Sequence, residues 1–170
     1  VLIGAIGGFQ DLETCDNAVA SGKCDLVFAA RAFISNSDFG QILMEGRNED
    51  IVPCVRCNKC HGRSSSDPFV SVCTVNPEIG LQQKIDRLVT KPVRSKKVAV
   101  IGGGPGGMRA ALWLKDRGHE PVIFEKENFL GGKIMHSDNV EFKWPLKRFK
   151  DYLIRQLDVK GIEVRLGVKP

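Results

Sequence analysis

The sequence lacks the features that would place a protein in a membrane or on a nucleic acid. No apolar run reaches the roughly 18 residues that a membrane-spanning helix needs, and nothing at the N-terminus resembles a signal peptide. The net charge is only +5, and the basic residues are scattered apart from short groups at 91–97 and 143–150. That distribution is typical of a solvated surface. We therefore expect a cytoplasmic protein with no membrane or nucleic-acid partner.

The apolar residues predict an α/β fold. They make up 42% of the 170 residues, enough for packed cores. Two βα units open the chain, which fits either a doubly wound sheet or the end of a barrel. We expect Ser35 or Ser37 to cap the second helix. The predicted strands are 1–6 and 25–30, and the predicted helices are 11–21 and 38–45. Because the chain starts and stops at predicted strands, we expect it to be part of a longer polypeptide.

The most informative feature is a group of cysteines on one segment. Cys54, Cys57 and Cys60 lie at two-residue spacing, and Cys73 follows after twelve intervening residues. Two disulfides are one alternative, but the flanking sequence is not that of a small secreted domain. Structural zinc is another, although zinc sites tend to use two separated C-x2-C pairs. Three sulfurs on one short loop and a fourth alone favour an iron–sulfur cluster. The remaining cysteines are expected to be inert and buried: Cys15 and Cys24.

A glycine-rich run connects an apolar strand to a helical stretch. The strand is 97–101 and the helix 108–117. A G-x-G-x-x-G run in that context predicts a dinucleotide-binding loop, against the alternative of a turn that binds nothing. Gly102 permits the tight turn, Gly104 lets the backbone approach a pyrophosphate, and Gly107 lets helix and strand pack closely. The helix N-terminus would supply free N–H groups to the phosphates.

Glu125 ends the next predicted strand, 121–124, eighteen residues beyond Gly107. A carboxylate there can accept hydrogen bonds from an adenosine ribose and disfavours a 2′-phosphate, so we expect FAD, ADP or NAD rather than NADP at this site. A glycine pair follows at 131–132, for which a positive φ is the default interpretation. The expected cofactor-binding residues of this region are Gly102, Gly104, Pro105, Gly106, Gly107, Glu125, Gly132 and Lys133.

Pro145 is predicted to open a helix, because proline is pre-set for the first helical turn. Its apolar stripe is Leu146, Phe149, Leu153 and Leu157. Gly161 is expected to end the helix, and 162–166 alternates like a strand. We expect the basic residues of the helix to form its solvated face.

The order of these motifs resembles the multidomain branch of the old yellow enzyme family, which includes 2,4-dienoyl-CoA reductase, clostridial enoate reductases and trimethylamine dehydrogenase. The resemblance is carried by the cysteine spacing and by the runs Cys73–Pro77 and Val98–Gly107. It implies four parts. These are the last two βα units of a (β/α)8 TIM barrel at 1–50, an iron–sulfur loop at 51–80, a linker at 81–96 and the N-terminal part of a Rossmann-like FAD- or ADP-binding domain at 97–170.

The resemblance also assigns cofactors. An FMN phosphate would bind at the loops after barrel strands seven and eight, to the backbone N–H groups of Gly7, Gly8 and Ala30 and to the Arg31 guanidinium. A [4Fe-4S] cluster would be held by Cys54, Cys57, Cys60 and Cys73.

The function that the resemblance implies is an NAD(P)H-dependent flavin oxidoreductase. NAD(P)H would reduce FAD, the cluster would pass electrons to FMN, and FMN would reduce an activated C=C bond of a small-molecule substrate such as an enoate, a dienoyl-CoA or a steroid-like enone. An amine dehydrogenase with ADP in place of FAD and an external electron-transfer partner is a second hypothesis. A non-catalytic, zinc-stabilised nucleotide-binding module is a third. We expect the catalytic acid to lie upstream, the chain alone to be inactive and the full-length protein to be a homo-oligomer.

Overall fold

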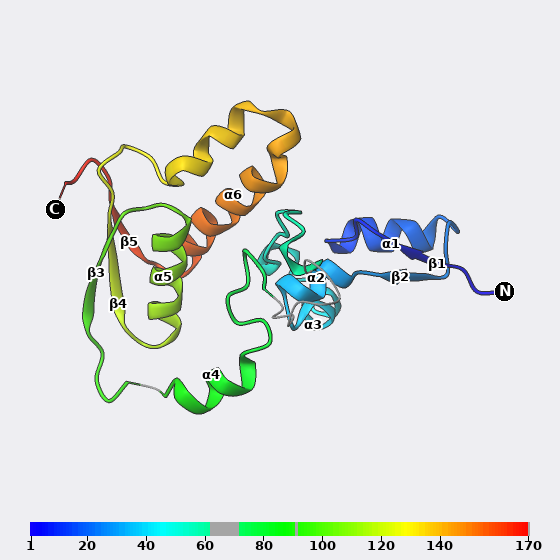
Figure 1. Cartoon of the computed structure of the whole chain (residues 1–170), viewed down its shortest axis with the longest axis horizontal. Helices are drawn as coiled ribbons and strands as arrows, with labels where there is room; N and C mark the ends of the chain where they lie inside the picture. Colours follow the sequence, from blue (N-terminus) through cyan, green and yellow to red (C-terminus); the bar gives the residue numbers. More distant parts are fainter. Residues whose placement is uncertain (62–71, 91, 170) are drawn as a thin grey trace. The chain divides into compact units, whose positions relative to one another are not determined.

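The computed structural model describes residues 1–61, 72–90 and 92–169, and the chain divides into two compact units, Val1–Asp86 and Arg87–Pro170 (Figure 1). Each unit contains its own parallel sheet, in agreement with the predicted α/β class. The middle of the predicted iron–sulfur loop, 62–71, lies outside the described residues. Of the helices that the model describes, none is both long enough and apolar enough to cross a membrane.

The first unit begins with a βαβ arrangement. β1 (Gly4–Ile6) pairs in parallel with β2 (Leu26–Phe28), and α1 (Leu12–Ala20) connects them. The Asp11 carboxylate caps α1 by accepting a hydrogen bond from the Thr14 backbone N–H at 2.9 Å. Gly22 ends the turn after α1 with a φ of 69°. The helix prediction is confirmed, whereas both strands are shorter than predicted because only three residue pairs align in register.

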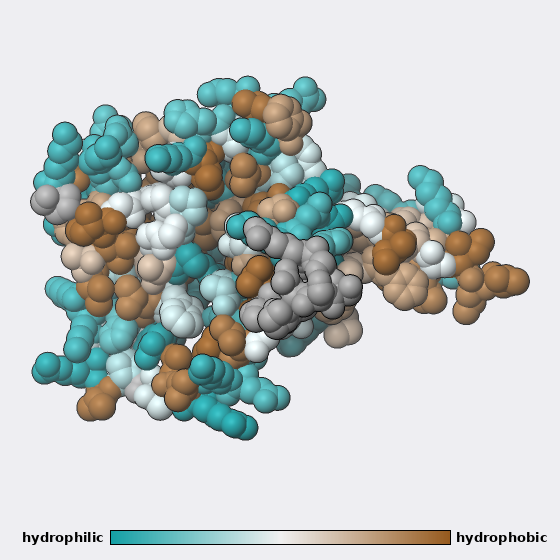
Figure 2. All heavy atoms as spheres, viewed as in Figure 1, coloured by the Kyte–Doolittle hydropathy of each residue, from teal (hydrophilic) through white to brown (hydrophobic). Residues whose placement is uncertain are grey.

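The β1–β2 pair exposes apolar side chains on one of its faces, whereas Ala5 and Val27, on the other face, are half-buried. Ile6 is 76% exposed, and Leu26 and Phe28 are about half exposed. Figure 2 shows apolar residues gathered around this end of the first unit. Parallel strands are normally buried on both faces, and two strands are too few to bury themselves. The exposed apolar residues therefore indicate that the pair is part of a larger sheet.

Two short helices and a small core complete the ordered part of the first unit. α2 (Ala30–Ser35) and α3 (Phe39–Met44) are followed by the 3-10 turns η1 (Asn48–Asp50) and η2 (Lys59–His61). The core residues are Ala32, Phe39, Ile42 and Ile51. The sequence did not predict α2, because its first residue was assigned to the preceding strand.

The predicted serine cap of α3 is wrong. The residue before α3 is Asp38, and it makes no side-chain capping bond. Ser35 is instead the last residue of α2, where its hydroxyl donates to the Ala32 carbonyl at 3.0 Å. A serine that bonds back to the previous turn of its own helix cannot cap the next helix.

The second unit is a three-stranded parallel sheet with helices on one face. β3 (Lys97–Ile101), β4 (Glu120–Phe124) and β5 (Glu163–Arg165) lie side by side in that order. α5 (Pro105–Asp116) and α6 (Trp144–Val159) pack together on the same side of the sheet (Figure 1). The 3-10 segments η3 (Gly132–Asn139) and η4 (Glu141–Lys143) precede α6. The buried core residues are Met108, Ala111, Leu112, Ile123, Phe149, Leu153 and Leu157.

The predicted linker at 81–96 includes a helix, α4 (Gln82–Leu88). One expectation for the second half of the chain needs correction. The basic residues of α6 are not all solvated, because Lys150 is only 7% exposed. Its ammonium group pairs with Asp138 and with Asp151 Oδ1 at 3.3 Å, which compensates the charge that is buried.

Leu153 provides the sharpest test of the second core. Its side chain is fully buried on α6, so Leu153→Ala should lower the free energy of unfolding by about 2–5 kcal/mol. Leu88→Ala is the matched control, since Leu88 is 69% exposed, and it should change the value by no more than about 0.5 kcal/mol. Urea denaturation followed by circular dichroism measures both. Equal effects of the two substitutions would contradict the packing described.

Candidate functional sites

The structure brings together all four residues predicted to bind a phosphate. Gly7, Gly8, Ala30 and Arg31 line one cleft of about 380 Å³ in the first unit. The two glycines follow β1 with φ values of 111° and 80°, a left-handed conformation that other residues rarely adopt. Ala30 and Arg31 open α2, directly after β2. Two parallel strands end on the same edge of a sheet, so their following residues meet there.

Three further polar residues line the same cleft and were not predicted: Gln10, Asn58 and His61. Arg31 Nη1 donates a hydrogen bond to Asn58 Oδ1 at 3.1 Å. Gln10 is only 4% exposed, and among the described residues neither atom of its amide group has a hydrogen-bond partner. A buried amide without a partner is costly. No sequence pattern pointed to these residues, because each contributes through a turn or a loop rather than through a recognisable motif.

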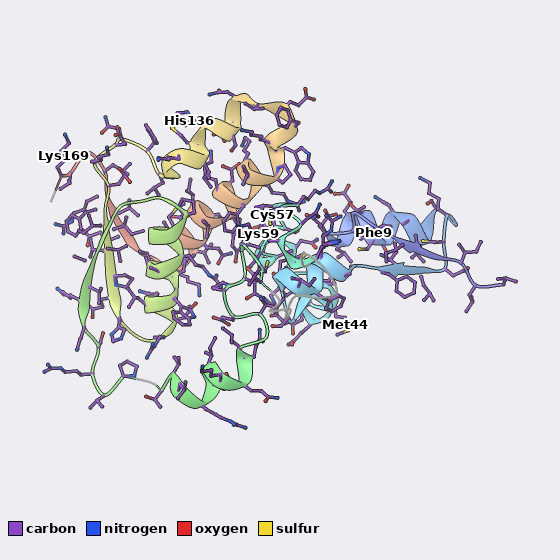
Figure 3. All side chains as sticks on the ribbon, in the orientation of Figure 1. Phe9, Met44, Cys57, Lys59, His136 and Lys169 are labelled. Atoms are coloured by element: carbon purple, nitrogen blue, oxygen red, sulfur yellow. The ribbon has the colours of Figure 1, made fainter. Side chains whose placement is uncertain are left out.

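The four predicted cluster ligands also share one pocket. Cys54, Cys57, Cys60 and Cys73 line it together with Thr74, and all four are free thiols. Arg31 and Asn58 line this pocket as well as the cleft. Figure 3 marks Cys57 and Lys59 on this loop. Among the residues that the model describes, no three His, Cys, Asp or Glu side chains are close enough to hold a metal ion.

Backbone N–H groups are directed at the sulfurs of this pocket. The Arg56 N–H donates to Cys54 Sγ at 3.4 Å. Partial burial raises the pKa of Cys57, but bonds from the Thr74 hydroxyl and from backbone N–H groups outweigh it, so the pKa lies below the usual thiol value. The Thr74 Oγ1 to Cys57 Sγ distance is 3.0 Å.

The pKa of Cys73 is shifted in the opposite direction, above the usual thiol value. Burial raises its pKa, the N–H groups of Val75 and Asn76 oppose that rise, and the charges of Cys54 and Cys57 add to it. Because the charges of Cys54 and Cys57 contribute to the raised pKa of Cys73, these groups are close enough to repel it, and a positively charged group between them would relieve the repulsion. The predicted inert cysteines lie outside this pocket: Cys24 is buried and Cys15 is half-buried.

Both ends of the cysteine loop are fixed to α2 by buried amides. Asn36 follows α2 and holds Val52, because its Oδ1 accepts from the Val52 N–H at 2.7 Å and its Nδ2 donates to the Val52 carbonyl at 3.0 Å. Asn76 Nδ2 donates to the carbonyl of Ile34, within α2, at 2.9 Å. Sequence reasoning missed both residues, since neither carries the chemistry of a ligand.

The glycine-rich loop in the second unit has the close packing that was predicted. Gly102 has a φ of 100°, and its N–H donates to the Phe124 carbonyl at 2.8 Å. A Cβ on Gly107 would lie 1.9 Å from the Gly102 carbonyl oxygen, so no other residue fits there. A Cβ on Gly104 would meet only the Cα of Gly132, at 4.0 Å. The protein alone does not demand glycine at position 104, so its predicted role toward a pyrophosphate stays a prediction.

Glu125 is buried beside this loop. Its Oε2 accepts from the Gly103 N–H at 2.6 Å and its Oε1 from the Glu127 N–H at 2.9 Å. These bonds, with the Glu127 N–H first, lower the pKa of the carboxyl group. The carboxylate therefore orders the glycine-rich loop, a role that the sequence did not reveal, and each oxygen retains a lone pair for a ribose hydroxyl.

The second glycine pair does more than satisfy a positive φ. Gly131 donates its N–H to the Gly103 carbonyl at 2.9 Å. A Cβ on Gly132 would approach the Gly104 Cα at 3.1 Å. The two glycine loops are therefore in contact, so Gly132 lies beside the predicted dinucleotide-binding loop. Pro105 and Gly106 lie in the first turn of α5, and Lys133 is exposed at the start of η3.

Known proteins match the sequence of both units. The family model for pyridine nucleotide-disulphide oxidoreductases matches residues 96–169. NADH oxidase of Thermoanaerobacter brockii is 35% identical over 96% of this chain and 25% of that protein. N,N-dimethylglycine/sarcosine dehydrogenase of Chromohalobacter salexigens is 31% identical over 94% of this chain and 23% of that protein.

The fold comparison agrees with the sequence relatives. A structure of 2-naphthoyl-CoA reductase superposes with a TM-score of 0.88 at 27% identity, over all of this chain and 26% of that one. These similarities agree with the resemblance of the chain to the multidomain old yellow enzyme family. The chain spans about a quarter of the length of the relatives that it matches.

Substitution of neighbouring glycines tests the loop geometry. Gly107→Ala should destabilise the second unit by several kcal/mol, because its Cβ would collide with backbone rather than with a movable side chain. Gly106→Ala is the matched control: a Cβ there meets nothing within 4 Å, and alanine favours a helix. Thermal unfolding of the two variants checks this. The geometry would be wrong if both variants melted at the wild-type temperature.

The lowered pKa of Glu125 predicts that the stability of the folded state depends on pH. A carboxyl group whose pKa is lowered by folding stabilises the folded state above its unfolded pKa of about 4.3, and this contribution is lost as the pH falls through the folded value. Glu125→Gln should therefore be less stable than wild type at pH 7, with a difference that shrinks below about pH 4. Glu120→Gln, at an exposed position on the same strand, is the control. Urea titrations across pH would contradict the assignment if the Glu125→Gln difference were constant.

Proposed function

We propose that this chain belongs to an iron–sulfur flavoprotein oxidoreductase, in which a [4Fe-4S] cluster at the cysteine pocket links an FMN site in the first unit to a FAD and NAD(P)H site in the second. The observation that carries the proposal is that four free cysteines share one pocket. Arg31 and Asn58 line both this pocket and the cleft that contains Gly7 and Gly8. The family's pyridine-nucleotide region and flavin-dependent relatives support flavin and NAD(P)H use.

The cysteine pocket fits the cluster in its chemistry. Thiolate is the ligand of iron–sulfur clusters, and four thiols are available here. The N–H groups at Cys54, Cys57 and Cys73 stabilise negative charge on sulfur, which is how a protein raises the reduction potential of such a site. When bound, the cluster would supply one-electron transfer between the flavins. The residues of the chain would hold it and set its potential.

The cleft fits the phosphate end of FMN. Gly7 and Gly8 present backbone N–H groups without side chains, and Arg31 adds a guanidinium, the side chain best suited to a phosphoryl group. The amide of Gln10, which has no partner among the described residues, offers a donor and an acceptor to a polar ligand. We place β1 and β2 as the last two strands of a (β/α)8 barrel, a proposal that the exposed apolar face of the pair supports.

The proposed reaction is reduction of an activated C=C bond. The relatives named as reductases include cinnamate reductase of Clostridium sporogenes, which is 31% identical over 95% of this chain. In this reaction the residues of the chain bind and orient the cofactors. The proton donor to the substrate would lie in barrel strands that precede β1.

Amine oxidation is a second candidate, favoured by the similarity to N,N-dimethylglycine/sarcosine dehydrogenase. The glycine-rich loop and Glu125 would contact only the adenosine diphosphate part of a cofactor, so they would bind ADP as well as FAD. Cofactor extraction from the full-length protein separates the two functions. FMN and FAD together support the reductase, whereas FMN with ADP and no second flavin would favour the dehydrogenase.

Metal analysis tests the proposed cluster. Full-length protein purified without oxygen should contain four iron and four acid-labile sulfide per chain, as a [4Fe-4S] cluster requires. Cys57→Ser should lose most of both. Cys15→Ser, at a thiol outside the pocket, should keep them. Stoichiometric zinc without iron would overturn the electron-transfer role and favour a zinc-stabilised module.

A further inference from the structure

The cleft and the cysteine pocket share a wall made of two side chains. Arg31 and Asn58 line both cavities, and Arg31 Nη1 donates to Asn58 Oδ1 at 3.1 Å. Arg31 comes from the first turn of α2, whereas Asn58 lies on the cysteine loop between Cys57 and Cys60. This bond therefore joins the part of the unit that would bind an anion to the part that would bind a metal cluster.

The backbone of Asn58 is held in a conformation that suits its hydrogen bond to Arg31. Its φ is 57°, a left-handed value that asparagine tolerates better than most residues. Its backbone carbonyl accepts from the His61 N–H at 3.1 Å and closes the turn η2. The backbone at Asn58 is thus fixed by the turn that carries Cys60, and the side-chain oxygen is free to face the guanidinium.

We infer that Asn58 is a positioning residue that orients the Arg31 guanidinium toward the FMN phosphate and makes phosphate binding depend on the order of the cysteine loop. This inference rests on the function proposed above. A guanidinium has five N–H donors in a fixed plane, so one bond to Asn58 restricts its orientation and leaves the remaining donors for phosphate oxygens. Asn58 carries no charge and is not a cluster ligand. Its effect would pass through Arg31.

Comparing FMN with riboflavin isolates the phosphate. Both flavins share the ring and the ribityl chain, and only FMN has the phosphoryl group. The experiment uses full-length protein with its cluster intact and its flavin removed, and it measures the dissociation constants of the two ligands by fluorescence quenching. The ratio of the riboflavin constant to the FMN constant is the phosphate preference. A general folding defect would weaken both flavins and leave this ratio unchanged.

Three variants make the test specific. Asn58→Gly accepts the left-handed φ without strain and removes the side chain, so it should lower the phosphate preference about tenfold, the scale of one lost bond to a charged group. Asn58→Asp keeps an oxygen acceptor for Arg31 but adds a negative charge that competes with the phosphate, so it should lower the phosphate preference at least as much as Asn58→Gly. Arg31→Ala should abolish most of the preference. Asn58→Ala repeats the comparison should Asn58→Gly fail to retain iron.

Removal of the cluster tests the coupling itself. Chelation of iron under anaerobic conditions should lower the phosphate preference of wild type, because the turn that holds Asn58 is then released. In Asn58→Gly the preference should already be low and should change little on chelation. The reason is that loss of the cluster and loss of the Asn58 side chain would act through the same Arg31–Asn58 hydrogen bond. An equal drop in wild type and in Asn58→Gly would overturn the coupling.

The outcomes separate this inference from the proposed function. If Arg31→Ala leaves the phosphate preference unchanged, the cleft does not bind the FMN phosphate and the proposed function fails at that site. If Arg31→Ala lowers the preference and Asn58→Gly does not, the cleft is correctly assigned and Asn58 has no positioning role. Equal weakening of FMN and riboflavin by Asn58→Gly would indicate a structural role and would also overturn the inference.

Discussion

The hydrogen bonds that hold the cysteine loop against α2 are the constraint on which the first unit depends. A loop rich in polar backbone cannot be buried without partners for its N–H and C=O groups. Asn36 satisfies both polar groups of Val52 at the start of the loop, and Asn76 holds the carbonyl of Ile34 at its end. With both ends fixed to one short helix, the thiols between them share a single pocket, and Arg31 on that helix faces them.

The second unit depends on a different constraint, the close approach of two glycine loops around a buried carboxylate. Gly107 leaves no space for a side chain, so α5 starts close to β3. Glu125 then accepts N–H bonds at the end of β4, which ties the glycine-rich loop to the neighbouring strand. Gly131, in the loop before η3, adds a further hydrogen bond from its N–H to the Gly103 carbonyl. The N–H groups at the start of α5 are thus held in place by the protein alone, so binding of a phosphate there would require little reorganisation.

Sequence patterns predicted the parts of this molecule that obey a period or a steric rule. The helix at 11–21, the strand at 97–101 and the apolar stripe of α6 all follow from spacing, and the structure has them. α2 escaped prediction because its first residue, Ala30, was assigned to the preceding strand. Lys150 was misassigned because a buried lysine is recognisable only from its partners, which come from η3 and from α6 itself. The residue types of the expected ligands could be read from motifs, whereas the amides that position them could not.

Electrostatics explains why a cation and amide groups surround the cysteine pocket. Burial is the main cause of the raised pKa of Cys73, and the charges of Cys54 and Cys57 add to it. Several thiolates in one place repel one another, so a site of this kind needs compensating positive charge. Backbone N–H groups supply it as fixed dipoles at short range, and Arg31 supplies a full charge. A phosphoryl group in the adjoining cleft would draw on that same charge. The potential of a cluster and the affinity for a phosphate would then be linked through one guanidinium, whichever direction electrons take.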